Sequence, residues 1–517
     1  MSRTRWIARA VLSDYILWGT TVVSGFALAP FLIRYLHPEG YGLWAIYASL
    51  LGYMGLIDLG LGPTTATQVA QFHVHGQSRL LDIWVSNILV VYLPLMLLVL
   101  AASAAIAPFA GHLFHVSPAL LPTASSAFLA ACVGLAVALP RSMLRGLIVG
   151  YQRTEVANLV DAAFALAAAG AMIVSAVKGA GLLGVTVAGA GVSLLQTLLT
   201  AWLVRWLFPG ISLIPKFSRP DLIVRALRFS LPIAAVFVTA QVVFRTDNIV
   251  IGLFRGPNAV ASYAVAYALV WFGLNLVFKL SDSLLPLFSG MQAGGEHDAL
   301  RHTYVESARL SLALAMCLTL GLLAFGKTAI AIWVGPQYFV GTPTLVVLAL
   351  LPTVHAVTHV GSILLIGLGR ARAIALMSVP DALLNLALSV VLMRWIGVVG
   401  VALGTVVGEL ATTFWYLPVL CNRELSLSGW AFFSRVWARP LLSLPPAAAV
   451  AWTVQMAFGR WPPAVVLLIG AATTAAAYFG TYFLFSTPEE RGTFRTAIRG
   501  LWATPHAIPA SGEAPPH

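Results

Sequence analysis

The sequence predicts an all-α polytopic membrane protein with about 14 transmembrane helices. Of its 517 residues, 59% are hydrophobic and only 9% are charged, whereas soluble proteins carry roughly 25% charged residues. Apolar stretches long enough to cross a bilayer, about 20 residues each, follow one another along the chain. The basic residues fall mainly in alternate loops between these stretches, as expected for a chain that crosses a membrane repeatedly.

The loops between the predicted helices are short. The longest, 208–226 and 291–303, are too small to hold a folded soluble domain, and the polar tail at 488–517 is predicted to be disordered. The protein must therefore act in or across the membrane. The predicted helices are 11–34, 40–70, 83–108, 122–148, 156–177, 181–207, 227–254, 258–290, 304–326, 343–366, 372–395, 398–422, 437–458 and 462–486.

The charge distribution predicts the orientation of the chain. Most of the 30 lysine and arginine residues lie in loops on the side of the N-terminus. This asymmetry follows the positive-inside rule and predicts that both termini are cytoplasmic. It also accounts for the net charge of +12 without a nucleic-acid partner. Arg245 alone is assigned to neither surface, and the basic residues on the opposite side are Arg34, Lys178, Arg255, Lys327, Arg394 and Arg460.

Two halves of the sequence resemble each other. The segment 147–169 aligns with 365–389, which pairs Asp161 with Asp381. Each half holds six predicted helices and starts on the same side, so the repeat is parallel, about an axis along the membrane normal. Such repeats are typical of transporters with a substrate site between the halves. We predict an N-terminal lobe at 1–207, a cytoplasmic linker at 208–226, a C-terminal lobe at 227–425 and two further helices at 426–487.

The stretch from Arg34 to Gln71 contains a turn and a carboxylate within an apolar span. Asp58 lies in the interior of the second predicted helix, and glycine and proline residues follow it. A charge at that depth is costly in lipid, so Asp58 should face the interior of the bundle or a water-filled cavity. The turn before this helix is predicted from Pro38, Glu39, Gly40 and Gly42.

Six acidic residues fall in the interior of predicted spans, away from their ends. A charged side chain at a helix centre costs about 2.5–3.5 kcal/mol on insertion scales, so as a set they indicate a hydrated central cavity. We predict that Asp161, Asp247, Asp381 and Glu409 couple transport to H⁺ or Na⁺, and the sequence does not choose between these ions. A structural hydrogen bond between helices remains the alternative for each. The six are Asp58, Asp161, Asp247, Asp282, Asp381 and Glu409.

Two other patterns suggest chemistry that the context disfavours. GLLAFGKT at 321–328 fits the P-loop spacing, but it ends an apolar helix on the non-cytoplasmic side, where it could not cradle ATP phosphates. His355 and His359 share a helix face, without a third ligand nearby. We interpret the pair as interior polar packing, with a proton relay and a metal site as alternatives. No metal site, cofactor or enzymatic activity is predicted.

Short motifs are spread over both halves: PEGYGLW at 38–44, IDLGLG at 57–62, RGLIVGYQR at 145–153, LRFSLP at 227–232, TDNIVIG at 246–252, AIWVG at 331–335 and LIGLGRA at 365–371. Together they resemble the polysaccharide-intermediate flippases of the multidrug/oligosaccharidyl-lipid/polysaccharide exporter superfamily. His37 stands where that family more often has a glycine. The resemblance covers about 10–425. It implies a two-lobed, V-shaped bundle that moves undecaprenyl-diphosphate-linked sugars across the bacterial inner membrane by alternating access.

Arg245 is the strongest candidate for substrate binding under this resemblance. An unpaired guanidinium within a span needs a carboxylate or a bound anion. Asp247 is two residues away and faces elsewhere on a helix, whereas Asp58, across the lobes, is a candidate partner. We predict that Arg245 contacts the substrate diphosphate and that Arg141 and Arg145 draw the head group in at the cytoplasmic mouth. A structural salt bridge or snorkelling is the alternative.

Two other functions remain as alternatives. The chain could be a cation-coupled multidrug or small-molecule antiporter, or a membrane-embedded polysaccharide polymerase or glycosyltransferase. The short external loops disfavour an enzyme, because they leave little chain to hold catalytic residues. The expected partners of a flippase are a lipid-linked oligosaccharide, membrane lipids, a coupling ion (H⁺ or Na⁺), and polysaccharide polymerase or other assembly machinery.

Overall fold

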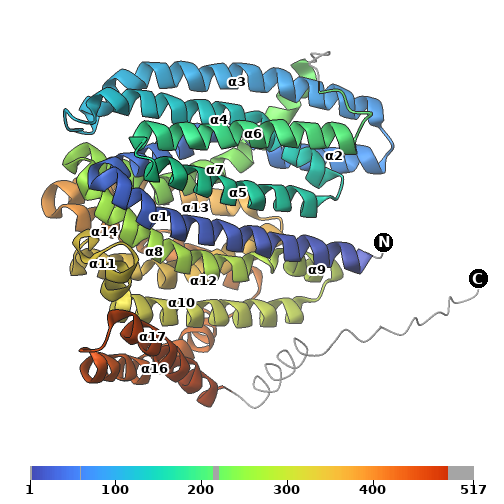
Figure 1. The fold of residues 1–517 in the computed structure, drawn as a ribbon. Coiled ribbons are helices and arrows are strands. Elements are labelled where there is room, and N and C mark those ends of the chain that lie inside the picture. The colour runs from blue at the N-terminus through green and yellow to red at the C-terminus, as the bar shows by residue number, and fades with distance from the viewer. Residues whose placement is uncertain (1–2, 59, 214–219, 487–517) are drawn as a thin grey trace, which may run out of the picture.

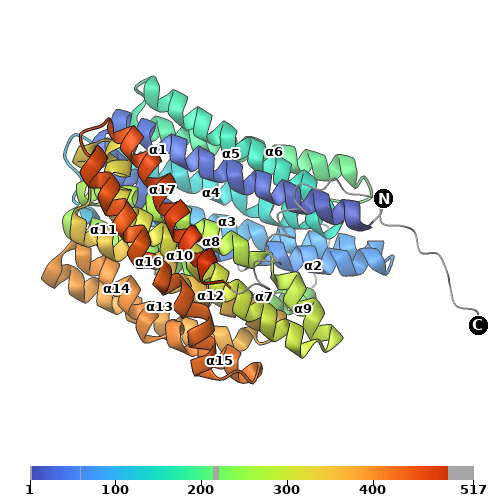
Figure 2. The same cartoon turned by 90° about the horizontal axis from the view of Figure 1, so that it is seen from below.

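The structure is a computed structural model that describes residues 3–58, 60–213 and 220–486, with side chains described from residue 9 onwards except at 214–237. The predicted tail at 488–517 lies outside the described residues, as does the middle of the predicted linker. In the described part of the chain every regular element is helical, and the long helices run roughly alongside one another as a bundle (Figures 1 and 2). The prediction of an all-α membrane protein is confirmed.

The first half of the chain forms one group of helices, here called the N-terminal lobe. The long helices of this lobe carry apolar runs of roughly 20 residues or more, enough to span a bilayer. The elements of the lobe are α1 (Arg3–Gly55), the 3₁₀ turn η1 (Leu56–Asp58), α2 (Leu61–Val74), α3 (Ser78–Leu113), α4 (Leu121–Gly150), α5 (Thr154–Val177) and α6 (Gly181–Leu207).

The second half forms the C-terminal lobe, followed by two more helices. Prolines occupy the first turns of several of these helices, where their missing N–H leaves no hydrogen bond unmade. The lobe contains α7 (Pro220–Arg255), α8 (Pro257–Asp282), α9 (Leu285–Gly294), α10 (His297–Trp333), η2 (Pro336–Tyr338), α11 (Thr342–Ala349), α12 (Leu351–Gly367), α13 (Ala371–Ile396), α14 (Val398–Ala411) and α15 (Thr413–Glu424); α16 (Gly429–Phe458) and α17 (Pro463–Leu484) follow.

Twelve helical segments of the described chain are long and apolar enough to cross a membrane. The longest is a run of 66 residues, Arg9–Val74, which contains the break between the first two predicted spans. The total of 14 therefore stays a prediction. The P-loop-like stretch at 321–328 lies inside α10, whose continuous helical backbone leaves no loop to cradle a phosphate.

The structure corrects two local predictions. The chain reverses at His37, whose φ of 59° and ψ of 171° are nearly restricted to glycine, while Pro38 and the glycines after it are already helical. The predicted turn at 38–42 was therefore placed too late, and the glycine usual at position 37 in the resembled family was the relevant signal. The predicted loop at 291–303 is also mostly helical, because α9 and α10 extend into it.

Small residues allow α13 and α14 to pack closely. Gly400, Gly404 and Gly408 recur every four residues on α14 and so share one face. A Cβ atom at Gly404 would lie 2.6 Å from the backbone nitrogen of Ser389 on α13. This small-xxx-small spacing brings the backbones together where helices associate without a hydrophobic driving force. The interface fixes the relative positions of Asp381 on α13 and Glu409 on α14.

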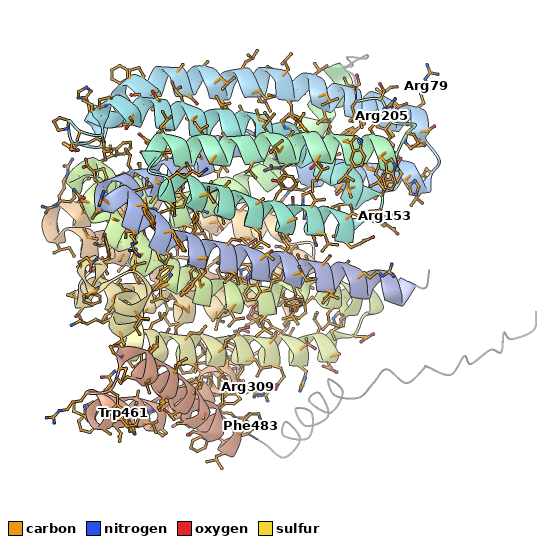
Figure 3. All side chains as sticks on the ribbon, in the orientation of Figure 1. Arg79, Arg153, Arg205, Arg309, Trp461 and Phe483 are labelled. Carbon is orange, nitrogen blue, oxygen red and sulfur yellow. The ribbon has the colours of Figure 1, made fainter. Side chains whose placement is uncertain are left out.

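The ends of the bundle agree with the predicted charge asymmetry. Arg79, Arg153 and Arg205 lie at the end where the chain begins, and Trp461 lies at the opposite end (Figure 3). The helices α16 and α17 pack against α10 on the outside of the C-terminal lobe (Figures 1 and 2). We call the end that carries the N-terminus the N-side and the other end the far side.

Candidate substrate and ion sites

A pocket of about 160 Å³ lies between the two lobes, lined by α1, α7 and α8. Arg245 lines it and makes no hydrogen bond or ion pair with the described residues of the chain. Two more lining groups, the Asn248 Oδ1 atom and the Tyr267 hydroxyl, are buried without a partner. Buried polar groups are nearly always satisfied, by protein, water or ligand. The aromatic residues of the wall are Tyr41, Trp44, Phe244, Tyr267 and Trp271.

Contacts between the lobes border this pocket. The Tyr53 hydroxyl pairs with Thr246, and Asn248 donates to the Ser49 hydroxyl at 3.1 Å. Closer to the far side, α1 touches the start of α8. A Cβ atom at Gly42 would lie only 1.8 Å from the carbonyl oxygen of Pro257. Gly42, predicted to form a turn, instead permits this contact between helices.

Asp58 does not pair with Arg245 in this conformation. It accepts a hydrogen bond from the Tyr92 hydroxyl at 2.5 Å and one from the Ser142 hydroxyl at 3.3 Å. The backbone N–H groups of Leu61 and Gly62, at the start of α2, also point to its carboxylate. A carboxylate there is stabilised by the unpaired N–H groups and the dipole of the helix N-terminus. These contacts give Asp58 a structural role within the N-terminal lobe.

Arg141 and Arg145 line a larger cavity of about 600 Å³ inside the N-terminal lobe. Arg145 donates to Asp161 at 2.7 Å and to Asn158 at 2.8 Å. Gln196 joins the two arginines, because it accepts from Arg141 at 2.6 Å and donates to Asp161 at 2.9 Å. Two guanidinium groups and one carboxylate leave a net positive charge. The structure thus separates these arginines from Arg245 and pairs Asp161, predicted to bind an ion, with Arg145.

Asp247 is buried at a third place, where α7, α8 and α14 meet. It accepts hydrogen bonds from the Tyr263 hydroxyl and, at 3.5 Å, from the Thr405 hydroxyl. The amide of Asn385 on α13 is fully buried, and neither its oxygen nor its nitrogen has a partner. Asp247 has no cation within 4 Å among the described side chains, so it remains a candidate for ion coupling.

The other two predicted ion-coupling residues meet at a cavity of about 320 Å³ in the C-terminal lobe. Glu409 lies 3.4 Å from His355 Nδ1 and accepts a hydrogen bond from Thr358 at 3.0 Å. Asp381 accepts from Thr412 at 2.8 Å and is within hydrogen-bonding reach of Glu409. Asp381 and Glu409, predicted separately, therefore belong to one cluster.

Sequence reasoning missed the partners of the two histidines. His359 contacts Asp282 at 2.8 Å and stacks on the Phe278 ring at 4.1 Å, whereas His355 joins the acid pair. The signal was present in the spacing of four residues, which places both histidines on one helix face. Nothing in the sequence shows that the same face looks towards α14, so interior polar packing was the simpler interpretation.

Comparison with known proteins identifies the family. The model of the polysaccharide biosynthesis protein family matches residues 14–292, which is more than half of the chain. This protein belongs to that family. An uncharacterized membrane protein of Methanocaldococcus jannaschii is 26% identical over 188 residues, which is 36% of this chain and 37% of the relative. The chain therefore aligns with little more than a third of that relative's length.

Solved structures show the same fold. The lipid II flippase MurJ in an inward closed conformation superposes with a TM-score of 0.73 at 12% identity, covering 95% of this chain and all of MurJ. An inward-facing multidrug resistance MATE family transporter of the MOP superfamily gives 0.66 at 16% identity, over 81% of this chain and 98% of the transporter. This polysaccharide biosynthesis protein is thus a multi-pass membrane protein with the fold of MOP superfamily transporters.

Proposed function

We propose that this protein is a flippase that carries an undecaprenyl-diphosphate-linked oligosaccharide from the cytoplasmic to the outer leaflet of the bacterial inner membrane. The observation that carries the proposal is the unpaired guanidinium of Arg245 in a pocket between the two lobes. A cation in a membrane interior needs an anionic partner, and no described carboxylate supplies one. A diphosphate offers planar pairs of acceptor oxygens that match the donor fork of arginine.

The size of the pocket indicates how the cycle must proceed. About 160 Å³ holds roughly five waters at liquid density, which suits a phosphate group but not an oligosaccharide. The lobes must therefore separate to admit the sugars, and the Gly42–Pro257 contact marks the side that is closed here. In the proposed orientation the N-side is cytoplasmic. The cavity at Arg141 and Arg145 carries a net positive charge, and we assign it to attracting the anionic head group.

The lipid tail and the driving force fit this assignment. A polyprenyl tail can stay in the bilayer while the head group passes between the lobes. A diphosphate carries about two negative charges, and an inside-negative potential favours outward movement of each by about 2.3 kcal/mol per 100 mV. Translocation therefore needs no ATP, in agreement with the continuous helix at 321–328. We infer that a coupling ion and the glycan assembly machinery act together with this protein.

Substitution of Arg245 tests the proposal. A hydrogen bond between charged groups contributes about 1.5–3 kcal/mol, so Arg245→Ala should slow translocation of an undecaprenyl-diphosphate-linked oligosaccharide roughly 10- to 100-fold. Arg245→Lys keeps the charge but loses the bidentate fork, and should retain part of the activity. The matched control is Arg255→Ala, which removes an exposed arginine at the end of the same helix.

The assay uses purified protein in proteoliposomes and measures the saccharide that becomes accessible to an enzyme added outside. Normal insertion with wild-type translocation by Arg245→Ala would refute the role of Arg245. Efflux of cationic drugs without movement of the lipid-linked saccharide would favour the antiporter instead.

A further inference from the structure

The cavity of the C-terminal lobe contains a cluster with an uncompensated charge. His355 on α12, Glu409 on α14 and Asp381 on α13 line it together. With the imidazole protonated and both carboxylates ionised, the cluster carries one net negative charge. Burial of an uncompensated charge is unfavourable, and His355 and Glu409 are only 6% and 5% exposed. One added proton makes the cluster neutral.

The contacts within the cluster show where that proton fits. Asp381 and Glu409 are within hydrogen-bonding reach of each other, and two carboxyl groups can form such a bond only when one of them is protonated. The Nε2 atom of His355 is buried and has no partner, so the imidazole has a free position facing away from Glu409. The site can therefore accept and release a proton with small movements of its side chains.

A proton suits this site better than a metal ion. Among the described residues, no group of three or more histidine, cysteine, aspartate or glutamate side chains converges in a metal-binding arrangement. One of the Glu409 oxygens already faces both the imidazole and the Thr358 hydroxyl. Hard cations such as Na⁺ take oxygen ligands. The imidazole of His355 already contacts the Glu409 carboxylate, so it competes with such a cation for that ligand.

A partly exposed acid and a second histidine lie between the N-side and the cluster. Asp282, at the end of α8, has a side chain 51% exposed and contacts His359 at 2.8 Å. His359 stacks on Phe278, whose ring centroid lies 6.1 Å from that of His355. The end of α8 lies beside α9 near the N-side of the bundle (Figure 1). His359, His355 and the two buried acids line the cavity, and Asp282 contacts His359 outside that lining.

The charged groups on the surrounding helices are paired or lie outside the cavity, as Asp247 of α7 does. On α10, Arg309 and Glu306 pair with each other. On α8, Lys279 pairs with Asp14 of α1 and Asp282 pairs with His359. The described part of α7 contributes Thr239 and Phe244 to this cavity, and α15 contributes Thr413 and Leu417. Among the described residues that line the cavity, the acids are Glu409 and Asp381, and they lie there with His355.

One residue connects this cluster to the pocket between the lobes. Phe244 lines both cavities, and its ring centroid lies 5.4 Å from that of His355. Its neighbour in the chain is Arg245, the proposed diphosphate ligand. Phe244 is therefore the side chain through which a change in the charge or packing of the cluster would reach the wall of the substrate pocket.

We propose that His355, Glu409 and Asp381 form a binding site for one proton, which is released to the N-side through His359 and Asp282 and is the coupling proton of the transport cycle. The coupling rests on the proposed flippase function, whereas proton binding does not. In the step itself, the carboxylic acid of the Asp381–Glu409 pair gives up its proton, which passes by way of His359 and Asp282 to a water molecule at the N-side. A hydronium ion is the product, and the cluster charge changes from zero to minus one. Binding of a proton from the far side reverses these changes.

The test is pH-difference infrared spectroscopy of the purified full chain in lipid nanodiscs, without substrate. Wild-type protein should show a carboxylic acid C=O band that appears as the pH falls. Asp381→Asn and Glu409→Gln should each abolish this band, while Asp381→Glu should restore it at a shifted pH. His355→Gln should move the midpoint of the titration. Glu424→Gln is the control, because it removes an acid of the same lobe that pairs with Arg370 outside the cavity.

The possible outcomes separate the two proposals. If no carboxyl band titrates in wild-type protein, or if the band survives both Asp381→Asn and Glu409→Gln, the proton site is refuted. A band that Na⁺ abolishes at constant pH would also overturn it, in favour of a sodium site. In proteoliposomes, Asp381→Asn should keep the response to membrane potential and lose the response to a pH gradient. A protein that shows the band but moves no lipid-linked saccharide would refute only the flippase function.

Discussion

The contact between Gly42 and Pro257 makes a sharp prediction about the far-side gate. In Gly42→Ala, the new Cβ atom would lie 1.8 Å from the Pro257 carbonyl oxygen, whereas ordinary contacts begin at about 3.4 Å. The obstacle is backbone on α8, so the strain cannot be relieved by a side-chain rotation. The helices α1 and α8 must separate by about 1.6 Å at this point, which breaks the contact between the lobes.

The size of the effect follows from the cost of overpacking. Inserting a methyl group into a well-packed contact costs about 1–3 kcal/mol. That cost falls only on the conformation in which the lobes touch at this end, so it shifts the equilibrium towards the far-side-open state by about 5- to 150-fold. Gly19→Ala, on the same helix, is the matched control because a Cβ atom there meets nothing within 4 Å.

The assay measures access to the pocket between the lobes. The three native cysteines are replaced by alanine, and Ala48→Cys places a single thiol in the pocket wall. A membrane-impermeant maleimide added on the far side should label the Gly42→Ala protein faster than the parent. The Gly19→Ala protein should label at the parental rate. Equal labelling of all three proteins, at similar stability, would refute the assignment of this contact as the gate.

Three other substitutions test the structure. His37→Gly should raise the melting temperature in detergent, since it relieves a backbone conformation that costs about 1–3 kcal/mol for a residue other than glycine; an unchanged or lower value would contradict the break at this residue. Gly404→Val should lower the yield of folded protein on size-exclusion chromatography, whereas Gly191→Val, at an open position, should not; equal yields would contradict the packing of α13 on α14. Tyr92→Phe removes a donor to Asp58 and should cost about 1–3 kcal/mol in thermal unfolding; an unchanged melting temperature would contradict the structural role of Asp58.

Properties that depend on the amino-acid composition and on the repeated alternation of apolar stretches and basic loops could be predicted from the sequence. Apolar stretches of bilayer length and the alternation of basic loops were sufficient for the fold class, and Arg153 and Arg205 lie at the same end of the bundle as the N-terminus, as the predicted alternation of helices requires (Figure 3). Arg245 was identified because it is the one basic residue that belongs to neither surface. These signals are local or additive, so they do not require knowledge of which helices touch.

The partners of the interior charges could not be predicted, because they depend on the rotation of each helix and on contacts distant in the sequence. Asp58 was considered as a partner for Arg245, but Tyr92 of α3 and the N-terminus of α2 satisfy it. The contact of His355 on α12 with Glu409 on α14 joins residues 54 positions apart in the chain. The role of Gly42 was misread because glycine serves both turns and close helix contacts, and only the structure distinguishes the two.

Transport by the wild-type protein tests the central claim most directly. Proteoliposomes that contain purified protein and an undecaprenyl-diphosphate-linked oligosaccharide are given a potassium diffusion potential, without ATP. Two negative charges crossing 100 mV gain about 4.6 kcal/mol. The saccharide should therefore accumulate in the leaflet on the positive side, and it should reverse leaflets when the sign of the potential is reversed. No movement of the saccharide under either potential, or movement only when ATP is added, would contradict the proposed flippase.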